Sequence, residues 1–363
     1  MRKFKNLVAA TVVFWTITCA SVVASSQVSD LVTQVSQANL QGHITALQGE
    51  RATTLQQAAA ADYIRDELEA YGYTVQSDPV GSSENLIADL TGTLRPNEIF
   101  LVGAHFDTVS GTPGADDNAS GLAGLLEIAR VLAGTETDAT VRLVAFALEE
   151  AGLVGSNQLA QAAGSAGWNL IGMISLEMIG YTCASPCQVP FTNTPPCVTF
   201  KTEGVTAGDF VGVVANSASA SLITDFETAV SGHVAGLPVV WAQVAGTGAC
   251  FPDSRRSDHA PFWDEGFPAI MVTDTANFRN PNYHGAGDTL ATLDLGFASD
   301  VTRATLAMVA LRVGAVPPEV PALGSGALLL LAPALGIAGG LALRRQWERE
   351  RSEKGRRPAA DGY

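Results

Sequence analysis

The sequence predicts an α/β fold, namely a three-layer α/β/α sandwich whose mixed, mostly parallel sheet lies between two layers of helices. Three observations lead to this expectation. Short apolar segments alternate with longer helix-like ones along the chain. Roughly 290 residues lie between two atypical end segments, and this length is sufficient for one large hydrophobic core. The sequence contains no internal repeat.

The first half of the chain supplies the clearest elements. Helical patterning covers residues 40–50 and 58–71, which we expect to pack outside the sheet and to carry no chemistry. Strand-like apolar segments cover residues 85–90, 99–104 and 141–148. Because helices and strands alternate rather than form separate blocks, the layered arrangement is favoured over a segregated one.

Three strand-like segments are each followed at once by a potential metal ligand: His105, the Glu149–Glu150 pair, and Glu177. Open α/β sheets bind their ligands outside the carboxyl ends of the strands, so this placement is informative. Adjacent residues on a strand face opposite sides. One member of the glutamate pair can therefore bind a metal while its neighbour stays free as a base.

Two more potential ligands lie in turn-rich segments. Asp117 lies in Pro113–Gly121, ahead of a helix-like segment, and His284 lies in Phe278–Thr289. Helix capping is the simplest role for an aspartate in the first segment. However, Asp116 and Asp117 are adjacent, and a helix needs only one cap. A carboxylate with two oxygens can also bridge two cations.

Six residues together have the composition of a two-zinc hydrolase, with two imidazoles, three coordinating carboxylates and one spare carboxylate: His105, Asp117, Glu149, Glu150, Glu177 and His284. Imidazole nitrogen and carboxylate oxygen are both zinc ligands. A surface loop, or a pair of solvated glutamates, is the alternative for each segment taken alone. The joint pattern is much less expected by chance than any one segment.

In their order, these segments resemble the motifs of the cocatalytic di-zinc aminopeptidases, relatives of the secreted bacterial leucyl aminopeptidases and of glutamate carboxypeptidase II. The resemblance covers roughly residues 40–312 and is most specific in the Asp-Asp-Asn-Ala-Ser-Gly and Glu-Glu elements. The matching segments are His105–Asp107, Pro113–Gly121, Glu149–Ser156, Leu176–Tyr181, Arg256–Trp263 and Tyr283–His284.

The resemblance implies two zinc ions per chain that share the carboxylate of Asp117. The other implied ligands form two pairs, namely Glu150 with His284 and His105 with Glu177. The family often has aspartate where this chain has Glu177, so the longer side chain leaves the geometry of that zinc site less defined. The resemblance also implies a cis peptide bond between Asp117 and Asn118.

Glu149 is the implied general base. A hydroxide held between the two zinc ions would attack the scissile carbonyl, with Glu149 accepting the proton of the water and passing it to the leaving amine. Tyr283 is a candidate donor to the developing oxyanion, with a packed aromatic side chain as the alternative.

Two aspartates are expected behind the ligands. Asp107 would orient His105, as a carboxylate beside a metal-bound histidine usually does. Asp258 would orient a ligand or line the substrate pocket, and His259 is a weaker candidate for the same role. Structural hydrogen bonding is the alternative for Asp258 and His259.

Both chain ends suggest export. Residues 1–24 have the basic, apolar and small-residue regions of a signal peptide, with cleavage expected near Ala24. After a catalytic domain at 25–313, residues 314–321 form a proline-rich linker. Residues 322–343 carry no charge and are long enough for a transmembrane helix, although they also resemble a bacterial sorting signal that a sorting enzyme would process. A core helix is the alternative. The basic tail, 344–363, then lies in the cytoplasm.

Charge and cysteine content agree with an extracytoplasmic domain. Residues 25–343 contain 11 Lys and Arg and 32 Asp and Glu, a net charge of −21, which argues against nucleic acid as a partner. Four cysteines remain after removal of the signal peptide, namely Cys183, Cys187, Cys197 and Cys250. An even number in an exported protein predicts two disulfides, with three possible pairings. An all-cysteine zinc site is the alternative. Three of the cysteines lie in an insert after Glu177, residues 182–198, which we expect at the rim of the active site.

We therefore expect an exported zinc aminopeptidase, either anchored in a membrane or released after processing, that hydrolyses N-terminal residues from peptides with a free N-terminus. The first alternative is another di-zinc exopeptidase, such as a carboxypeptidase, or a glutaminyl-cyclase-like enzyme. An inactive binding ectodomain on the same fold is the alternative from a different class.

Overall fold

The computed structural model describes residues 26–191 and 196–317. The expected signal peptide at 1–24, the membrane or sorting segment at 322–343 and the basic tail at 344–363 lie outside the described residues. Among the helices that are described, none combines the length and the apolar character needed to cross a bilayer.

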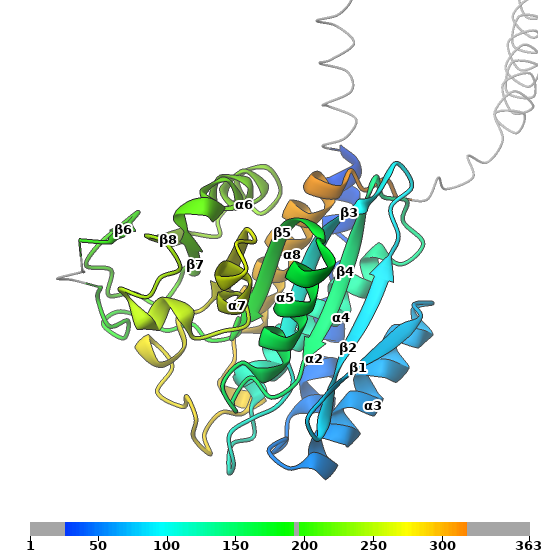
Figure 1. Ribbon diagram of the computed structural model, residues 1–363. Coiled ribbons are helices and arrows are strands. Elements are labelled where there is room, and N and C mark those ends of the chain that lie inside the picture. The colour runs from blue at the N-terminus through cyan, green and yellow to red at the C-terminus, as the bar shows by residue number, and fades with distance from the viewer. Residues whose placement is uncertain (1–25, 192–195, 318–363) are drawn as a thin grey trace, which may run out of the picture. The chain divides into compact units, whose positions relative to one another are not determined.

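Nine strands form one mixed sheet with the spatial order β1-β2-β4-β3-β5-β9-β7-β8-β6 (Figure 1). The parallel pairs are β3 with β4, β3 with β5, β5 with β9, and β7 with β8; the other four neighbouring pairs are antiparallel. The sheet was predicted to be mostly parallel, but only half of its neighbouring pairs are parallel, because antiparallel pairs occur toward both edges. The strands are β1 (Val75–Val80), β2 (Ser83–Leu90), β3 (Arg95–His105), β4 (Ala139–Phe146), β5 (Asn169–Glu177), β6 (Val198–Phe200), β7 (Val211–Asn216), β8 (Val239–Val244) and β9 (Ala269–Thr273).

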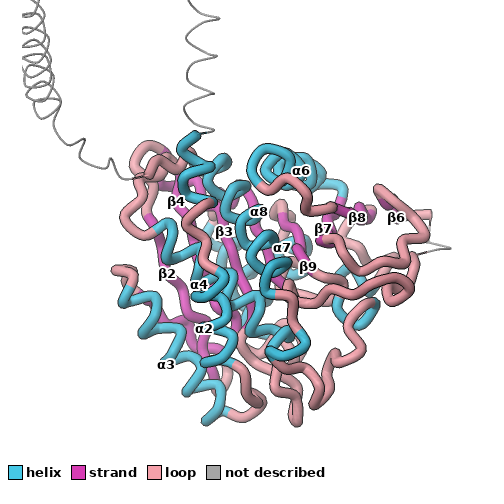
Figure 2. The backbone as a smooth tube through the Cα atoms, turned by 180° about the vertical axis from the view of Figure 1, so that it is seen from behind, coloured by secondary structure: helices cyan, strands magenta, loops and turns pink. Residues whose placement is uncertain are grey.

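Helices cover both faces of the sheet, as expected for a three-layer sandwich (Figures 1 and 2). One face packs against α2 (Gln37–Leu47), α3 (Thr54–Ala70), α4 (Gly121–Leu132), α6 (Ala220–His233) and α8 (Leu295–Val313). The other face packs against α5 (Val154–Ala166) and α7 (Ala260–Asp264). Each face has its own apolar core, and α4 is buried almost all round because it lies between the sheet and other helices.

Local signals explain where several elements begin and end. The helix expected at 58–71 starts at Thr54, because Thr53 and Gln56 form a capping box at its N-terminus. At the other end of the domain, α8 stops at Gly314, whose φ of 65° suits glycine. After α8 the chain stays in contact with the domain, because Val316 forms an antiparallel β-bridge with Glu136. Residues 314–317 of the expected linker thus belong to the folded unit.

The carboxyl ends of the four central strands position the site. Strands β4, β3, β5 and β9 are neighbours and run parallel, so their ends meet at one edge of the sheet. His105 is the last residue of β3 and Glu177 is the last residue of β5. The Glu149–Glu150 pair lies in the turn that follows β4. The residues that follow these strands in the sequence therefore lie together at this edge of the sheet.

Candidate metal centre

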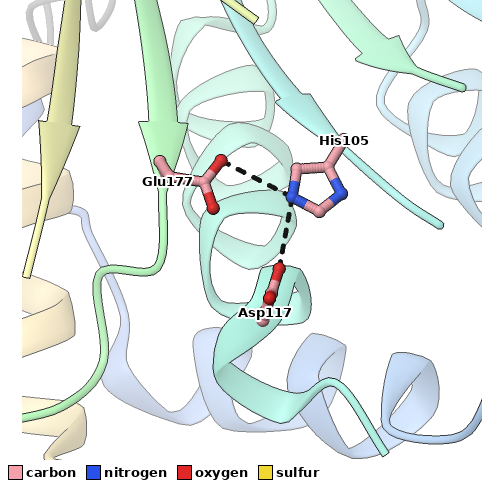
Figure 3. Close-up of side chains that lie close together, drawn as sticks. All are labelled: His105, Asp117 and Glu177. Carbon is pink, nitrogen blue, oxygen red and sulfur yellow. Dashed lines mark ion pairs between the residues drawn. The ribbon is translucent and has the colours of Figure 1, made fainter. Parts of the chain in front are cut away.

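Two groups of ligand atoms meet at this edge, and Asp117 belongs to both. In the first group, His105 Nε2 lies 3.3 Å from Asp117 Oδ1 and 3.5 Å from Glu177 Oε2 (Figure 3). In the second, His284 Nε2 lies 3.1 Å from Asp117 Oδ2 and 3.3 Å from Glu150 Oε1. The structure thus brings all five predicted ligands together, with the two oxygens of Asp117 directed to different groups.

The chemistry of these atoms fits metal ions. Among the described residues, both carboxylate oxygens of Asp117 and Nε2 of His105 are buried and have no hydrogen-bond partner. Buried polar atoms are normally satisfied, so unpaired atoms that lie beside one another have the chemistry of a cation site. Two imidazoles and three carboxylates suit zinc.

The pKa values of the histidine and aspartate side chains also show that this site favours positive charge. Burial opposes protonation of His284, but its contacts with Asp117 and Glu150 outweigh this effect and raise its pKa to about 9. Burial would raise the pKa of Asp117, yet His105 and His284 hold that pKa below its ordinary value. The carboxylates around the two histidines therefore make positive charge favourable at this position, as a cation site requires.

Asp117 is presented by the irregular turn η1 (Ala115–Ser120), and the Asp117–Asn118 peptide bond is cis, as the resemblance implied. The Asn118 side chain anchors this turn to the end of β5. Its Oδ1 accepts hydrogen bonds from the N–H groups of Met178 and Gly121, while its Nδ2 donates to the Leu176 carbonyl. A Cβ at Gly121 would lie 2.4 Å from Asn118 Oδ1, so glycine is needed there. Asn118, rather than an aspartate, is thus the side chain that bonds the start of α4.

Asp107 supports the site by two routes. Its carbonyl oxygen lies 3.2 Å from His105 Nδ1, and its carboxylate Oδ1 lies 3.5 Å from the same nitrogen. The carboxylate oxygens accept hydrogen bonds from the backbone N–H groups of Glu149 and Glu150, each at 3.0 Å. Asp107 therefore lies beside His105 as expected and also holds the turn that carries the glutamate pair.

Glu149 lies in neither ligand group. Burial raises the pKa of its carboxyl well above the ordinary value; His105 opposes this shift, and Glu177 and Asp258 add to it. A half-buried carboxylate with a raised pKa is a better proton acceptor than a fully solvated one. The neighbouring side chains thus have different environments, with Glu150 beside His284 and Glu149 outside both ligand groups.

Glu177 is held by a serine that the sequence analysis did not single out. Ser257 Oγ donates a 2.8 Å hydrogen bond to Glu177 Oε2 and is in turn 2.8 Å from Ser175 Oγ. This bond fixes the longer side chain that stands where the family often has aspartate.

Tyr283 borders the centre. Its ring stacks on His284 with 3.8 Å between centroids, and its hydroxyl oxygen accepts a 2.9 Å hydrogen bond from Arg256. Because the oxygen is used as an acceptor, its proton remains available for donation. Burial raises the pKa of this phenol, which keeps it protonated.

The two residues after Ser257 differ in their surroundings. Asp258 is fully buried, and neither carboxylate oxygen has a hydrogen-bond partner among the described residues. Burial raises its pKa to about 7, and His105 opposes the shift. His259 instead packs edge-on against Trp263, and its Nε2 bonds the Ser254 carbonyl. These contacts make His259 a structural residue.

Two disulfides are present, as predicted, and they pair Cys183 with Cys187 and Cys197 with Cys250. The all-cysteine zinc alternative is therefore wrong. The insert does lie near the active site, because its Phe191 lines the same pocket as Glu177 and Tyr283. Aromatic side chains dominate this pocket, namely Phe191, Phe200, Phe210, Trp241, Phe251 and Phe278.

Arg51 and Asp288 were also missed by the sequence analysis. The buried Arg51 guanidinium donates to five backbone carbonyls, those of Leu47, Gly49, Phe106, Pro113 and Gly114. It thereby ties the chain after His105 to the chain before Asp117. The Asp288 carboxylate accepts the backbone N–H groups of Asp116 and Asp117. The contacts that join these segments have no local sequence signal, because they connect residues that are more than 50 positions apart.

The family model for Peptidase family M28 matches residues 85–309, which is more than half of the chain. The chain belongs to peptidase family M28. All five residues of the two ligand groups lie inside the matched segment. This M28 peptidase is a zinc metallopeptidase, and the expected family and enzyme class are confirmed.

Relatives and solved structures agree with this assignment. The M28 peptidase is 35% identical to YfbL of Escherichia coli over 245 residues, covering 63% of this chain and 72% of that protein. It is 29% identical to a probable zinc metalloprotease of Leptosphaeria maculans over 329 residues, covering 77% and 75%.

Two solved structures show the same fold. The LapA aminopeptidase of Legionella pneumophila has a TM-score of 0.63 at 19% identity, with 79% of this chain and 75% of that chain covered. Glutaminyl cyclase of Porphyromonas gingivalis has a TM-score of 0.58 at 19% identity, with 77% and 99% covered. One fold thus supports both activities, and the reaction must be argued from the site.

Proposed function

We propose that this M28 peptidase is an aminopeptidase that binds two zinc ions through the two ligand groups and hydrolyses the first peptide bond of its substrates. The observation that carries the proposal is the position of Asp117, whose two oxygens face His105 and His284 in separate groups. Zinc bound there would polarise the scissile carbonyl and lower the pKa of the attacking water.

The residues of the chain supply the proton transfers. Glu149 accepts the proton of the attacking water and returns it to the leaving amine, a role that suits its raised pKa and its half-buried position outside both ligand groups. The Tyr283 hydroxyl donates to the oxygen that becomes negative in the transition state. Arg256 orients this hydroxyl, because its guanidinium donates a hydrogen bond to the phenol oxygen and leaves the hydroxyl proton for the substrate.

The aromatic pocket supports a preference for large apolar N-terminal residues. Phe191 stacks on Phe200 with 5.3 Å between centroids and packs against Phe278 at 4.9 Å. The charged residues at this pocket besides Glu177 are Asp253 and Arg256, which lie 3.5 Å apart and partly neutralise each other. An apolar side chain therefore gains more than a charged one by entering this pocket.

A carboxypeptidase or a glutaminyl-cyclase-like enzyme is the second candidate, because the cyclase shares the fold. An inactive binding ectodomain is disfavoured, since all five ligand residues and the spare glutamate converge at one edge of the sheet. Export stays part of the proposal. It is supported by two disulfides, which form mainly in oxidising compartments. Fractionation of cells that express the chain with or without residues 322–363 tests membrane anchoring.

The deciding experiment compares peptides of one sequence with a free N-terminus, an acetylated N-terminus or an amidated C-terminus. The proposal expects release of the first residue from the free and the amidated peptides and no cleavage of the acetylated one. Chelation should abolish release and added zinc should restore it. Cleavage that requires a free C-terminus would identify a carboxypeptidase, and ring closure of N-terminal glutamine without hydrolysis would identify a cyclase.

A further inference from the structure

Asp117 is held from two sides, and the two anchors lead to different ligand groups. On one side, Asn118 bonds the end of β5, the strand that carries Glu177. On the other side, Asp288 bonds the backbone of the turn itself, with its Oδ1 2.8 Å from Asp116 N and its Oδ2 3.0 Å from Asp117 N. Each anchor thus faces one of the two groups that share Asp117.

Asp288 belongs to the loop of His284. It lies four residues further along the chain, and its backbone N–H donates to the Gly285 carbonyl at 3.1 Å. Its own carbonyl accepts the N–H of Ala115 at 3.3 Å. Three hydrogen bonds therefore join this loop to residues 115–117, and Asp288 is fully buried at the junction.

The two ligand histidines differ in how much support they have. His105 ends a central strand, and its side chain is 1% exposed. His284 lies in a loop, has a positive φ of 55°, and its side chain is 33% exposed. The loop position of His284 therefore depends on tertiary contacts such as those of Asp288, whereas the strand fixes His105 without them.

We propose that Asp288 is a positioning residue that holds the Asp117–Glu150–His284 group in register, so that its loss weakens metal binding at this group and leaves the His105–Asp117–Glu177 group largely intact. This inference rests on the proposed binding of two zinc ions. The carboxylate acts through the backbone of Asp117 and through the His284 loop, and its hydrogen bonds go to backbone N–H groups rather than to the ligand side chains.

Asp288→Asn is the main variant, because an amide keeps the shape but offers one acceptor oxygen where two N–H groups need one each. Asp294→Asn is the matched control. Asp294 also accepts a backbone N–H, that of Phe297 at 3.0 Å, but it caps α8 and belongs to neither ligand group. Both variants lose a carboxylate that bonds the backbone, so both are expected to lower the melting temperature.

Zinc binding separates the two effects. The full-length protein is stripped of metal and titrated with Zn²⁺ against a chromogenic chelator. For Asp288→Asn we expect the first equivalent to bind within about threefold of the wild type, and the second about 10–100-fold more weakly, the range typical of residues behind metal ligands. The kcat should fall with the second affinity at little change in KM. Asp294→Asn should keep both affinities and kcat.

Unchanged affinities in Asp288→Asn, or an equal loss at both equivalents, would overturn the proposal. If Asp288→Asn is not recovered folded, Asp288→Glu, which moves the charge by one methylene, undergoes the same comparison with the same two outcomes. A wild-type protein that binds fewer than two zinc ions would instead contradict the proposed function, so the two failures are distinguishable.

Discussion

The adjacent residues Glu149 and Glu150 allow a matched test of the proposed mechanism, because the same substitution should have different consequences at each. Glu150 Oε1 lies 3.3 Å from His284 Nε2 within a ligand group, whereas Glu149 belongs to neither group. Glutamine has nearly the same shape as glutamate but cannot accept the proton. Glu149→Gln should therefore keep both metals and the fold.

General base catalysis contributes about 10²–10⁴-fold to a rate, which corresponds to about 2.7–5.4 kcal/mol of transition-state stabilisation. We expect kcat of Glu149→Gln to fall by that factor, with KM within about threefold of the wild type, since the aromatic pocket is untouched. The assay is steady-state hydrolysis of an aminoacyl-arylamide, combined with metal analysis of the same samples.

Glu150→Gln is the control. It removes a charged ligand, so it should lose metal and regain part of its activity in excess zinc, which Glu149→Gln should not do. Less than a tenfold loss of kcat in Glu149→Gln, or loss of metal from it, would refute the assignment of the general base.

Three further predictions concern the pocket, the disulfides and acid stability. Phe191→Ala removes one aromatic wall of the pocket, so a phenylalanyl side chain should lose a contact worth about 0.5–1.5 kcal/mol. The kcat/KM should therefore fall about 2–13-fold for a phenylalanyl-arylamide and much less for an alanyl one, and equal losses would argue against this pocket. Replacement of Cys197 and Cys250 by serine removes a cross-link between residues 53 positions apart, which gives the unfolded chain more conformational freedom. The free energy of unfolding in urea titrations should fall by about 4 kcal/mol, and a loss below about 1 kcal/mol would contradict this expectation. Burial lowers the pKa of His259 from 6.5 to about 3, so the unfolded chain takes up the proton first as pH falls. The contribution of neutral His259 to the free energy of unfolding is therefore complete above pH 6.5. It falls by about 1.4 kcal/mol per pH unit between pH 6.5 and about 3, and His259→Gln should show a shallower slope of stability against pH.

The predicted ligand residues lie close together in the structure, and two of them follow local signals in the sequence. His105 and Glu177 come directly after apolar runs, and those runs became β3 and β5, neighbours whose carboxyl ends meet. A strand's end is visible from hydrophobic patterning alone. Asp117 and His284 lie in turn-rich segments without periodicity, and the resemblance was needed to assign them to particular zinc sites.

The supporting residues could not be predicted in the same way. Asp288 bonds residues more than 170 positions earlier in the chain, and Ser257 bonds Glu177 across 80 positions. Arg51 lies beyond a helix that we expected to carry no chemistry, yet its guanidinium joins the loops beside two ligands. Such contacts depend on the three-dimensional arrangement, which the sequence pattern of each segment does not contain.

The outer strands show the same limit. The short edge strand β6 and the antiparallel pairing of β7 with β9 have no clear signal in the apolar pattern, so the sheet is less parallel than expected. The pocket is similarly assembled from aromatic residues scattered over residues 191–278. These aromatic residues line one pocket only because the fold brings the strands and the disulfide-linked insert together.

The central claim is that Asp117 joins two metal ions in one centre, and metal stoichiometry tests it most directly. Zinc titration of the metal-free protein, read by mass spectrometry under native conditions, should give two ions per wild-type chain. Asp117→Ala should abolish tight binding of both ions, because each group loses the same shared ligand. A single ion in the wild type, or two ions still tightly bound by Asp117→Ala, would contradict the account.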